Sequence, residues 1–180
     1  MSHLPPARPA VLYRPWQLAA ALRSRRHPPD AAVAAAILPP GLAPLFDAMA
    51  PEDRRHALRV VAALAARGEA APVLLQAALL HDVGKANGGV HLRHRVARVL
   101  LSRLWPAAWV WLSASPTGWR RPFWILAWHP ARGAEWIAAA GGGAELAALV
   151  RHHESAPPAA WAGTEMQRWH AALKWADARS

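Results

Sequence analysis

The stretch that decides the fold is Ala71-Pro-Val-Leu-Leu-Gln-Ala-Ala-Leu-Leu80, followed at once by His81-Asp-Val-Gly-Lys85. The apolar run predicts a buried helix, and Pro72 suits its first turn, where a missing N–H leaves nothing unpaired. Gly84 predicts the end of the helix, because glycine adopts a left-handed conformation at little cost. An imidazole and a carboxylate therefore end an apolar helix. Since a buried carboxylate needs a partner, this pair suggests a metal ion and raises the question of further ligands.

The composition predicts one globular all-α domain. The chain has 180 residues, of which 54% are apolar and 18% charged, so it can bury a sizeable core. It holds one Tyr, two Phe and long Ala/Leu runs, which favour helices over strands. There is no cysteine, so disulfides and thiolate metal sites are excluded.

The net charge of +10 raises the question of an anionic partner. Lysine occurs only at Lys85 and Lys174, so nearly all the excess is arginine, and this arginine is scattered along the chain. Arg, Ala, Pro and Trp are enriched together, which is typical of a compositional bias. No recognised motif indicates nucleic-acid binding, so we do not expect it.

Helical spacing and turn residues divide the chain into helices. A helical N-terminal extension over residues 1–50 is expected to pack on a main domain over residues 51–180. The predicted helices are Trp16–Arg26, Ala31–Leu38, Leu42–Met49, Pro51–Arg67, Ala71–Leu80, His91–Leu104, His129–Ala140, Ala144–Glu154 and a last helix that runs toward Asp177. Thr164-Glu-Met-Gln167 predicts a capping box for that last helix. In the helix Pro51–Arg67, the stripe Leu58, Val61, Ala62 and Ala65 is expected to face inward.

A tryptophan-rich insertion occupies residues 99–128 of the main domain. It holds Trp105, Trp109, Trp111, Trp119, Trp124 and Trp128. Prolines and arginines interrupt it too often for a transmembrane helix. We expect these indoles to pack on the bundle or to form a dimer face, and contact with a membrane surface stays open as an alternative. The N-terminus has no signal-peptide pattern, which predicts a cytoplasmic protein.

Histidines and aspartates recur near the ends of the predicted helices. Each lies beside an apolar stretch, and helical bundles hold metals with side chains from facing helices. Imidazole and carboxylate ligands suit Mn, Fe, Co, Zn or Mg. The candidate ligands are His56, His81, Asp82, His129, His152, His153 and Asp177.

In their order and context, these residues resemble the HD-domain superfamily of metal-dependent phosphohydrolases. Arg54-Arg-His-Ala-Leu-Arg-Val60, Leu79-Leu-His-Asp-Val-Gly-Lys85 and Trp175-Ala-Asp177 match its histidine, His-Asp pair and distant aspartate. His129-Pro-Ala-Arg-Gly133 and His152-His-Glu154 match the additional motifs of its binuclear branch, which includes the HD-GYP phosphodiesterases. The Asp-Gly-x-Gly-Tyr-Pro segment of those enzymes is absent here, where Ser155-Ala-Pro-Pro-Ala-Ala-Trp-Ala-Gly163 follows instead. Specificity for cyclic diguanylate is therefore not inherited.

The resemblance implies a helical HD-type bundle with two divalent metal ions. His56, His81, Asp82 and Asp177 would bind one ion, and Asp82 would bridge to a second ion bound by His129 and by His152, His153 or both. The ions would activate water for attack on a phosphate mono- or diester of a nucleotide or another phosphorylated small molecule. Asp82 and Lys85 are the expected catalytic residues, with Lys85 contacting phosphate. The alternative is a catalytically silent HD-fold protein that binds a protein or membrane through its tryptophan-rich segment.

Overall fold

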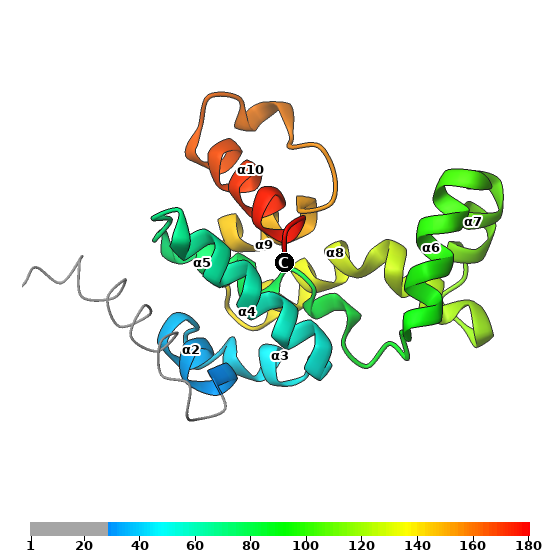
Figure 1. Cartoon of the computed structure of the whole chain (residues 1–180), viewed down its shortest axis with the longest axis horizontal. Helices are drawn as coiled ribbons and strands as arrows, with labels where there is room; N and C mark the ends of the chain where they lie inside the picture. Colours follow the sequence, from blue (N-terminus) through cyan, green and yellow to red (C-terminus); the bar gives the residue numbers. More distant parts are fainter. Residues whose placement is uncertain (1–28) are drawn as a thin grey trace, which may run out of the picture.

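The computed structural model describes residues 29–180, which are helical and contain no β-strand (Figure 1). The predicted all-α class is therefore confirmed for this part of the chain. Its α-helices are α2 (Pro29–Ile37), α3 (Ala43–Asp47), α4 (Pro51–Ala66), α5 (Pro72–Leu80), α6 (Leu92–Leu104), α7 (Pro106–Ser113), α8 (Arg121–Ala139), α9 (Ala144–His152) and α10 (Glu165–Asp177). Short 3-10 turns are η1 (Val83–Lys85), η2 (Gly118–Arg120) and η3 (Ala159–Trp161). The predicted helix Trp16–Arg26 lies outside the described residues.

The core is built around α5, whose sequence is apolar on every side. Leu74, Ala77, Ala78, Leu79 and Leu80 are all fully buried. A helix of this kind must be covered all round, and α2, α3, α4, α9 and α10 all pack against it. The apolar run predicted as a buried helix is therefore found as one, and its C-terminal end lies inside the bundle.

The short helices α2 and α3 belong to the same core. Val33, Leu38, Phe46 and Met49 are buried and join one continuous apolar cluster with α4 and α5. Burying these side chains stabilises the packing of residues 29–50 on the rest of the bundle.

The predicted stripe of α4 is correct only in part, and the predicted cap of α10 is wrong. The buried stripe of α4 is Ala57, Val60, Val61 and Leu64. Of the expected stripe, Val61 is fully buried while Leu58 and Ala65 are partly buried against the core, so the helix is rotated slightly relative to the prediction. The rotation also buries Asp53, which pairs with Arg95 at 2.7 Å. Thr164 does not cap α10: its hydroxyl donates to the Trp161 carbonyl. The Gln167 side chain accepts the N–H of Gly163 instead of that of Thr164.

The prediction that α8 begins at His129 is also wrong. The helix begins at Arg121, with Pro122 in its first turn, and runs through Pro130 without ending there. A proline inside a helix removes one backbone hydrogen bond and leaves the carbonyl four residues earlier free. That carbonyl, on Leu126, accepts a hydrogen bond from the His129 side chain at 3.1 Å.

Gly84 does not end α5 in a left-handed conformation, because it lies in η1 and has no positive φ. The positive φ angles nearby belong to Asn87 and Gly89. Gly84 is required for a different reason: a Cβ there would collide with the carbonyl oxygen of His129 and lie 2.8 Å from the Gly133 nitrogen. The missing side chain lets η1 lie directly against α8.

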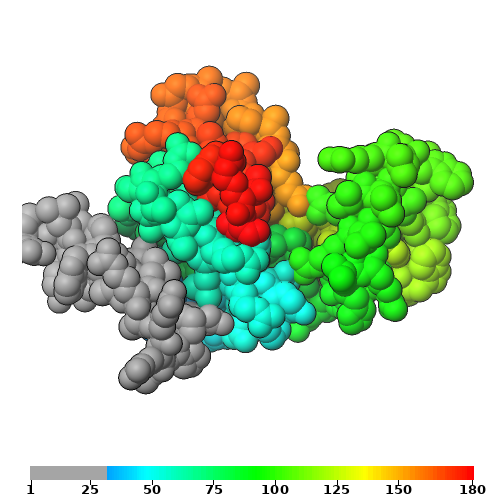
Figure 2. Space-filling model, viewed as in Figure 1, coloured from blue at the N-terminus to red at the C-terminus, as the bar shows by residue number. Residues whose placement is uncertain are grey.

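Helices α6 and α7 pack on each other and on α8, and they stand apart from the main body (Figures 1 and 2). We call this part, Leu92–Arg120, the α6–α7 hairpin. Within residues 29–180, no helix is both long enough and apolar enough to span a bilayer.

Candidate metal centre

The fold brings the predicted ligands together as two adjacent groups that could each hold a metal ion. His56, His81 and Asp177 form the first group, and Asp82, His129 and His153 form the second. They come from α4, the end of α5, α8, the end of α9 and the end of α10. Ligands that are distant in the sequence thus meet where several helices end.

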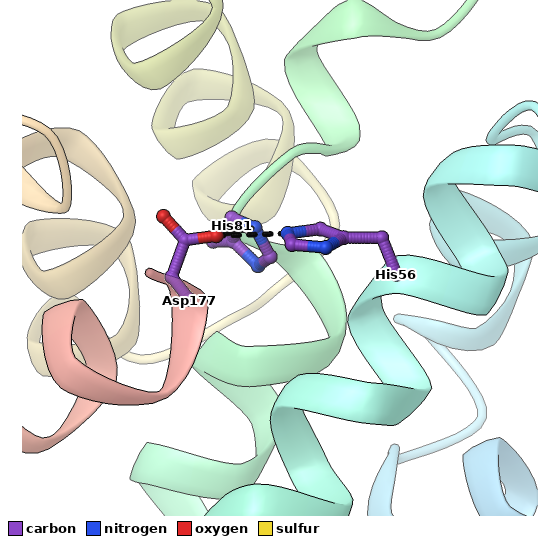
Figure 3. A group of neighbouring side chains, drawn as sticks. All are labelled: His56, His81 and Asp177. Carbon is purple, nitrogen blue, oxygen red and sulfur yellow. Dashed lines mark hydrogen bonds and ion pairs between the residues drawn. The ribbon is translucent and has the colours of Figure 1, made fainter. Parts of the chain in front are cut away.

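The first group is partly open to solvent. The Asp177 Oδ1 atom lies 2.8 Å from His56 Nε2 and 3.6 Å from His81 Nε2. Figure 3 shows Asp177 reaching from α10 toward His56 on α4, with the His81 ring beside the line joining them. Burial favours a raised pKa for Asp177, but the hydrogen bond from His56 and the nearby His81 lower it below its usual value of 3.8. This carboxyl group is therefore ionised at neutral pH.

The second group is buried. The Asp82 Oδ1 atom lies 3.3 Å from His129 Nε2 and 3.9 Å from His153 Nε2, and these two nitrogens are 3.3 Å apart. Burial favours a raised pKa for Asp82, but Lys85, His81 and His129 lower it well below its usual value of 3.8. An ionised carboxylate thus faces two imidazoles in a closed space.

Asp82 links the two groups. Its Oδ2 atom lies 3.7 Å from His81 Nε2 in the first group, while Oδ1 faces the second. The Lys85 ammonium group lies 2.7 Å from both carboxylate oxygens. This placement is compatible with the bridging role that the sequence resemblance implied for Asp82.

Backbone carbonyls fix the tautomers of the three buried histidines in these two groups. The Nδ1 atom of His81 lies 3.0 Å from the Ala78 carbonyl oxygen, that of His129 lies 3.1 Å from Leu126 O, and that of His153 lies 2.7 Å from Val150 O. A carbonyl only accepts hydrogen bonds, so each Nδ1 must carry the hydrogen. In the neutral ring, each Nε2 then presents a lone pair toward the centre.

These lone pairs lack suitable partners among the described side chains. His81 Nε2 is buried without a hydrogen-bond partner, and the Nε2 atoms of His129 and His153 face each other. A proton does not resolve the conflict at neutral pH, because burial and the nearby His81 and His129 lower the pKa of His153 to about 3. A cation accepts all of these lone pairs, so the donor set fits a divalent metal ion.

The three carbonyls that accept these histidine hydrogen bonds are free because the regular helical hydrogen bonding stops beside each of them. Ala78 and Val150 lie in the last turns of α5 and α9, where carbonyls have no partner within the helix. The Leu126 carbonyl is free because Pro130, four residues later, has no N–H. The helix ends and the proline therefore create the acceptors that orient the rings.

His152 is not brought into the cluster with its neighbour His153. Its Nδ1 lies 3.2 Å from the Ser155 hydroxyl oxygen, and its ring packs edge-on against Trp161. His152 and His153 are adjacent on helical backbone, so their side chains point in directions about 100° apart. Of the two histidines left as alternatives by the sequence, only His153 joins a metal-binding group.

Glu154 approaches the second group, although we did not predict it as a site residue. Its Oε1 atom lies 3.6 Å from His129 Nε2, and its other oxygen accepts a hydrogen bond from Arg98 at 2.6 Å. Burial favours a raised pKa for Glu154, but the bond from Arg98 and the nearby His129 lower it below its usual value of 4.5. The His-His-Glu motif was the sequence signal for this carboxylate.

A hollow of about 410 Å³ opens beside Lys85, between α6 and α8. Its walls are basic and apolar, comprising Lys85, Arg95, Arg98, Arg103, Ser102, Val99 and Leu126. An anionic molecule in this hollow would lie next to the carboxylate–lysine pair of Asp82 and Lys85. Arg132, in contrast, serves the fold, since it donates to the Gly84 carbonyl at 2.5 Å and lies over Trp136.

We found no family model, curated protein or solved structure that matches this chain. The site is therefore defined by its own geometry: buried histidine and aspartate groups, on a helical fold, that could hold a metal ion.

Proposed function

We propose that this chain is a metal-dependent phosphohydrolase of the HD-domain type, acting on a phosphate mono- or diester of a nucleotide or a similar small molecule. The observation that carries the proposal is the pair of histidine–aspartate groups joined by Asp82. Ions held a few ångströms apart need a shared anion between them, and the Asp82 carboxylate, whose oxygens face both groups, would supply it. The motifs His81-Asp82 and His152-His153-Glu154 support the same family.

Divalent ions at the two groups would supply a water-derived nucleophile and offset the negative charge of the phosphoryl oxygens. The chain itself orients the ligands through the carbonyls of Ala78, Leu126 and Val150. Lys85 keeps Asp82 ionised and faces the basic hollow, where its ammonium group can attract a phosphate as a point charge. Imidazole and carboxylate ligands are compatible with Mn, Fe, Co, Zn or Mg.

The test compares the neighbouring histidines His152 and His153. His153→Ala removes a ligand of the second group, so we expect the metal content to fall by about one ion per chain and the rate of phosphate release to fall by more than about tenfold. His152→Ala is the matched control, because its ring lies outside both groups, and we expect it to retain the wild-type values. Metal content is measured on reconstituted protein, and circular dichroism checks that both variants fold.

The substrate screen covers phosphomonoesters, cyclic dinucleotides and dinucleoside polyphosphates with each divalent metal. We expect turnover of at least one phosphate ester by the wild type and its loss in His153→Ala. Metal binding without turnover of any ester would instead favour the catalytically silent HD-fold protein. Absence of metal binding in the wild type would contradict the phosphohydrolase proposal.

A further inference from the structure

Helix α6 presents its apolar stripe to solvent. Leu92, Val96, Val99, Leu100 and Leu104 recur at helical spacing, and their exposed fractions range from 49% to 80%. The residue that α6 buries is His94, whose ring packs edge-on against Phe123. An amphipathic helix on a protein surface normally turns such a stripe toward the core. The stripe of α6 is therefore available to something outside the described part of the chain.

Exposed tryptophans add to the apolar surface of the hairpin. Trp105, Trp111 and Trp119 have exposed fractions of 66%, 57% and 68%. Among residues 29–180, every large apolar side chain that is exposed lies between Leu92 and Trp128. All of these residues except Trp128, which lies on α8, belong to the hairpin that projects from the body in Figure 2. A concentration of this kind marks an interaction surface rather than ordinary surface composition.

The charge of the hairpin is of one sign. The sequence has no Asp or Glu from residue 83 to residue 134. Arg93 and Arg103 are exposed on α6, and Arg103 lies one turn from Val99 and Leu100 on the same face. The Arg120 guanidinium lies 4.6 Å from the centre of the Trp111 ring, which places a cation and an indole side by side.

The arginines of α6 fall into two sets. Arg95 and Arg98 pair with Asp53 and Glu154, so they attach the hairpin to the body. Arg93 and Arg103 make no ion pair within residues 29–180 and interrupt the exposed apolar stripe. We do not expect a second copy of the chain to bind this face. A symmetric contact would bring the arginines of both copies together with no carboxylate to pair with them.

We propose that the α6–α7 hairpin docks on the surface of an anionic lipid bilayer. Tryptophan side chains favour the zone between headgroups and acyl chains, and arginines bind the lipid phosphates above it. The α6 stripe would lie in that zone, parallel to the membrane, as in other amphipathic surface helices. The proposal does not depend on metal binding or phosphohydrolase activity.

The test is co-sedimentation of the full chain with phosphatidylcholine vesicles, with and without phosphatidylglycerol. We expect binding only when phosphatidylglycerol is present, with a decrease as salt is added. Arg93→Glu/Arg103→Glu should lower vesicle affinity by more than about tenfold. The matched control is Arg59→Glu/Arg168→Glu, which makes the same change in net charge at exposed positions on α4 and α10. This control should keep most of the binding.

A second variant separates the apolar contribution from the charge. Trp111→Ser/Trp119→Ser should bind anionic vesicles several-fold more weakly while melting close to the wild type, since both indoles are exposed. Equal sedimentation of the wild type and Arg93→Glu/Arg103→Glu would overturn the proposal. A lipid-free dimer in light scattering that Leu100→Glu dissociates, without vesicle binding by the wild type, would overturn it in favour of a second copy.

Discussion

At the scale of the residue, the metal centre depends on which nitrogen of each histidine carries the hydrogen. His81, His129 and His153 each donate from Nδ1 to the carbonyl three residues earlier. Two of these carbonyls belong to helix ends, and the third is released by Pro130. The rings are therefore oriented by hydrogen bonds to nearby backbone, three residues earlier in each case.

Pro130→Ala restores a backbone N–H that competes with His129 for the Leu126 carbonyl. We expect metal affinity to fall by about 10- to 100-fold, because His129 loses the partner that fixes its tautomer. The melting temperature of the metal-free protein should not fall, because alanine suits a helix interior better than proline. Competition with a chelator measures the affinity. Pro122→Ala is the control, since Pro122 lies in the first turn of α8; an equal loss in both variants would contradict this role of Pro130.

The buried His153 predicts a pH dependence of stability in the metal-free protein. Its pKa is about 3 in the folded chain, against a usual value of 6.5. The unfolded chain binds a proton that the folded chain excludes, so stability should fall as pH decreases from 6.5 toward 3. His153→Gln should flatten this slope above pH 4.5, where the carboxyl groups of Glu154 and Asp177 contribute little. Urea unfolding with chelator present measures it, and an unchanged slope would contradict the prediction.

At the scale of the element, the two metal-binding groups meet because η1 crosses α8 without intervening side chains. Gly84 lies against the backbone of α8, and a Cβ on Gly133 would lie 3.1 Å from Val83 and 3.3 Å from the Gly84 nitrogen. The Arg132 side chain stabilises the same contact by donating a hydrogen bond to the Gly84 carbonyl. This contact sets the separation between Asp82, which precedes η1, and His129.

Gly84→Ala should separate η1 from α8. The added methyl group meets the backbone of α8 rather than a movable side chain, so we expect a loss of about 1–3 kcal/mol of unfolding free energy. Metal affinity should fall as well, because Asp82 and His129 move apart. Gly143→Ala is the matched control, since its φ of −64° suits alanine and a Cβ there meets no atom within 4 Å. Equal urea midpoints for the two variants would contradict the proposed role of Gly84 in the contact between η1 and α8.

Sequence patterns predict helices best where the pattern is local. The run Ala71–Leu80 and its end at His81 follow from apolar composition and a proline in the first turn, and the structure has α5 there. Pro130 leads to the wrong predicted start of α8, because a proline inside a helix cannot be distinguished by sequence from a proline in a first turn. The role of Gly84 depends on the approach of α8, which is a tertiary contact and leaves no local pattern.

Adjacent residues show the same limit within the site. His152 and His153 are equivalent in the motif, yet only the His153 ring enters the cluster, because helical backbone directs adjacent side chains about 100° apart. The motif therefore predicts that a histidine is present, while the rotation of α9 about its own axis decides which one points inward.

At the scale of the whole molecule, a bound metal would link segments that are far apart in the chain. The ligands range from His56 to Asp177, and they come from α4, the end of α5, α8, the end of α9 and the end of α10. Without an ion, the centre leaves His81 Nε2 unpaired and sets His129 Nε2 against His153 Nε2. Metal binding should therefore raise the stability of the entire bundle rather than of one helix.

This coupling predicts that replacing different metal-binding side chains reduces the metal-induced rise in melting temperature by different amounts. At a free metal concentration about 100-fold above Kd, a single site stabilises the folded chain by about 2.7 kcal/mol, which corresponds to about 5–10 °C for a chain of this size. His56→Ala should lose the part due to the first group, and His153→Ala the part due to the second. Asp82→Ala should lose nearly all of it, because Asp82 faces both groups. Differential scanning calorimetry with and without metal measures each increment relative to the same variant's metal-free melting temperature. If Asp82→Ala kept a metal-induced shift as large as that of His56→Ala, the two groups would be independent, and the carboxylate would not be shared between them.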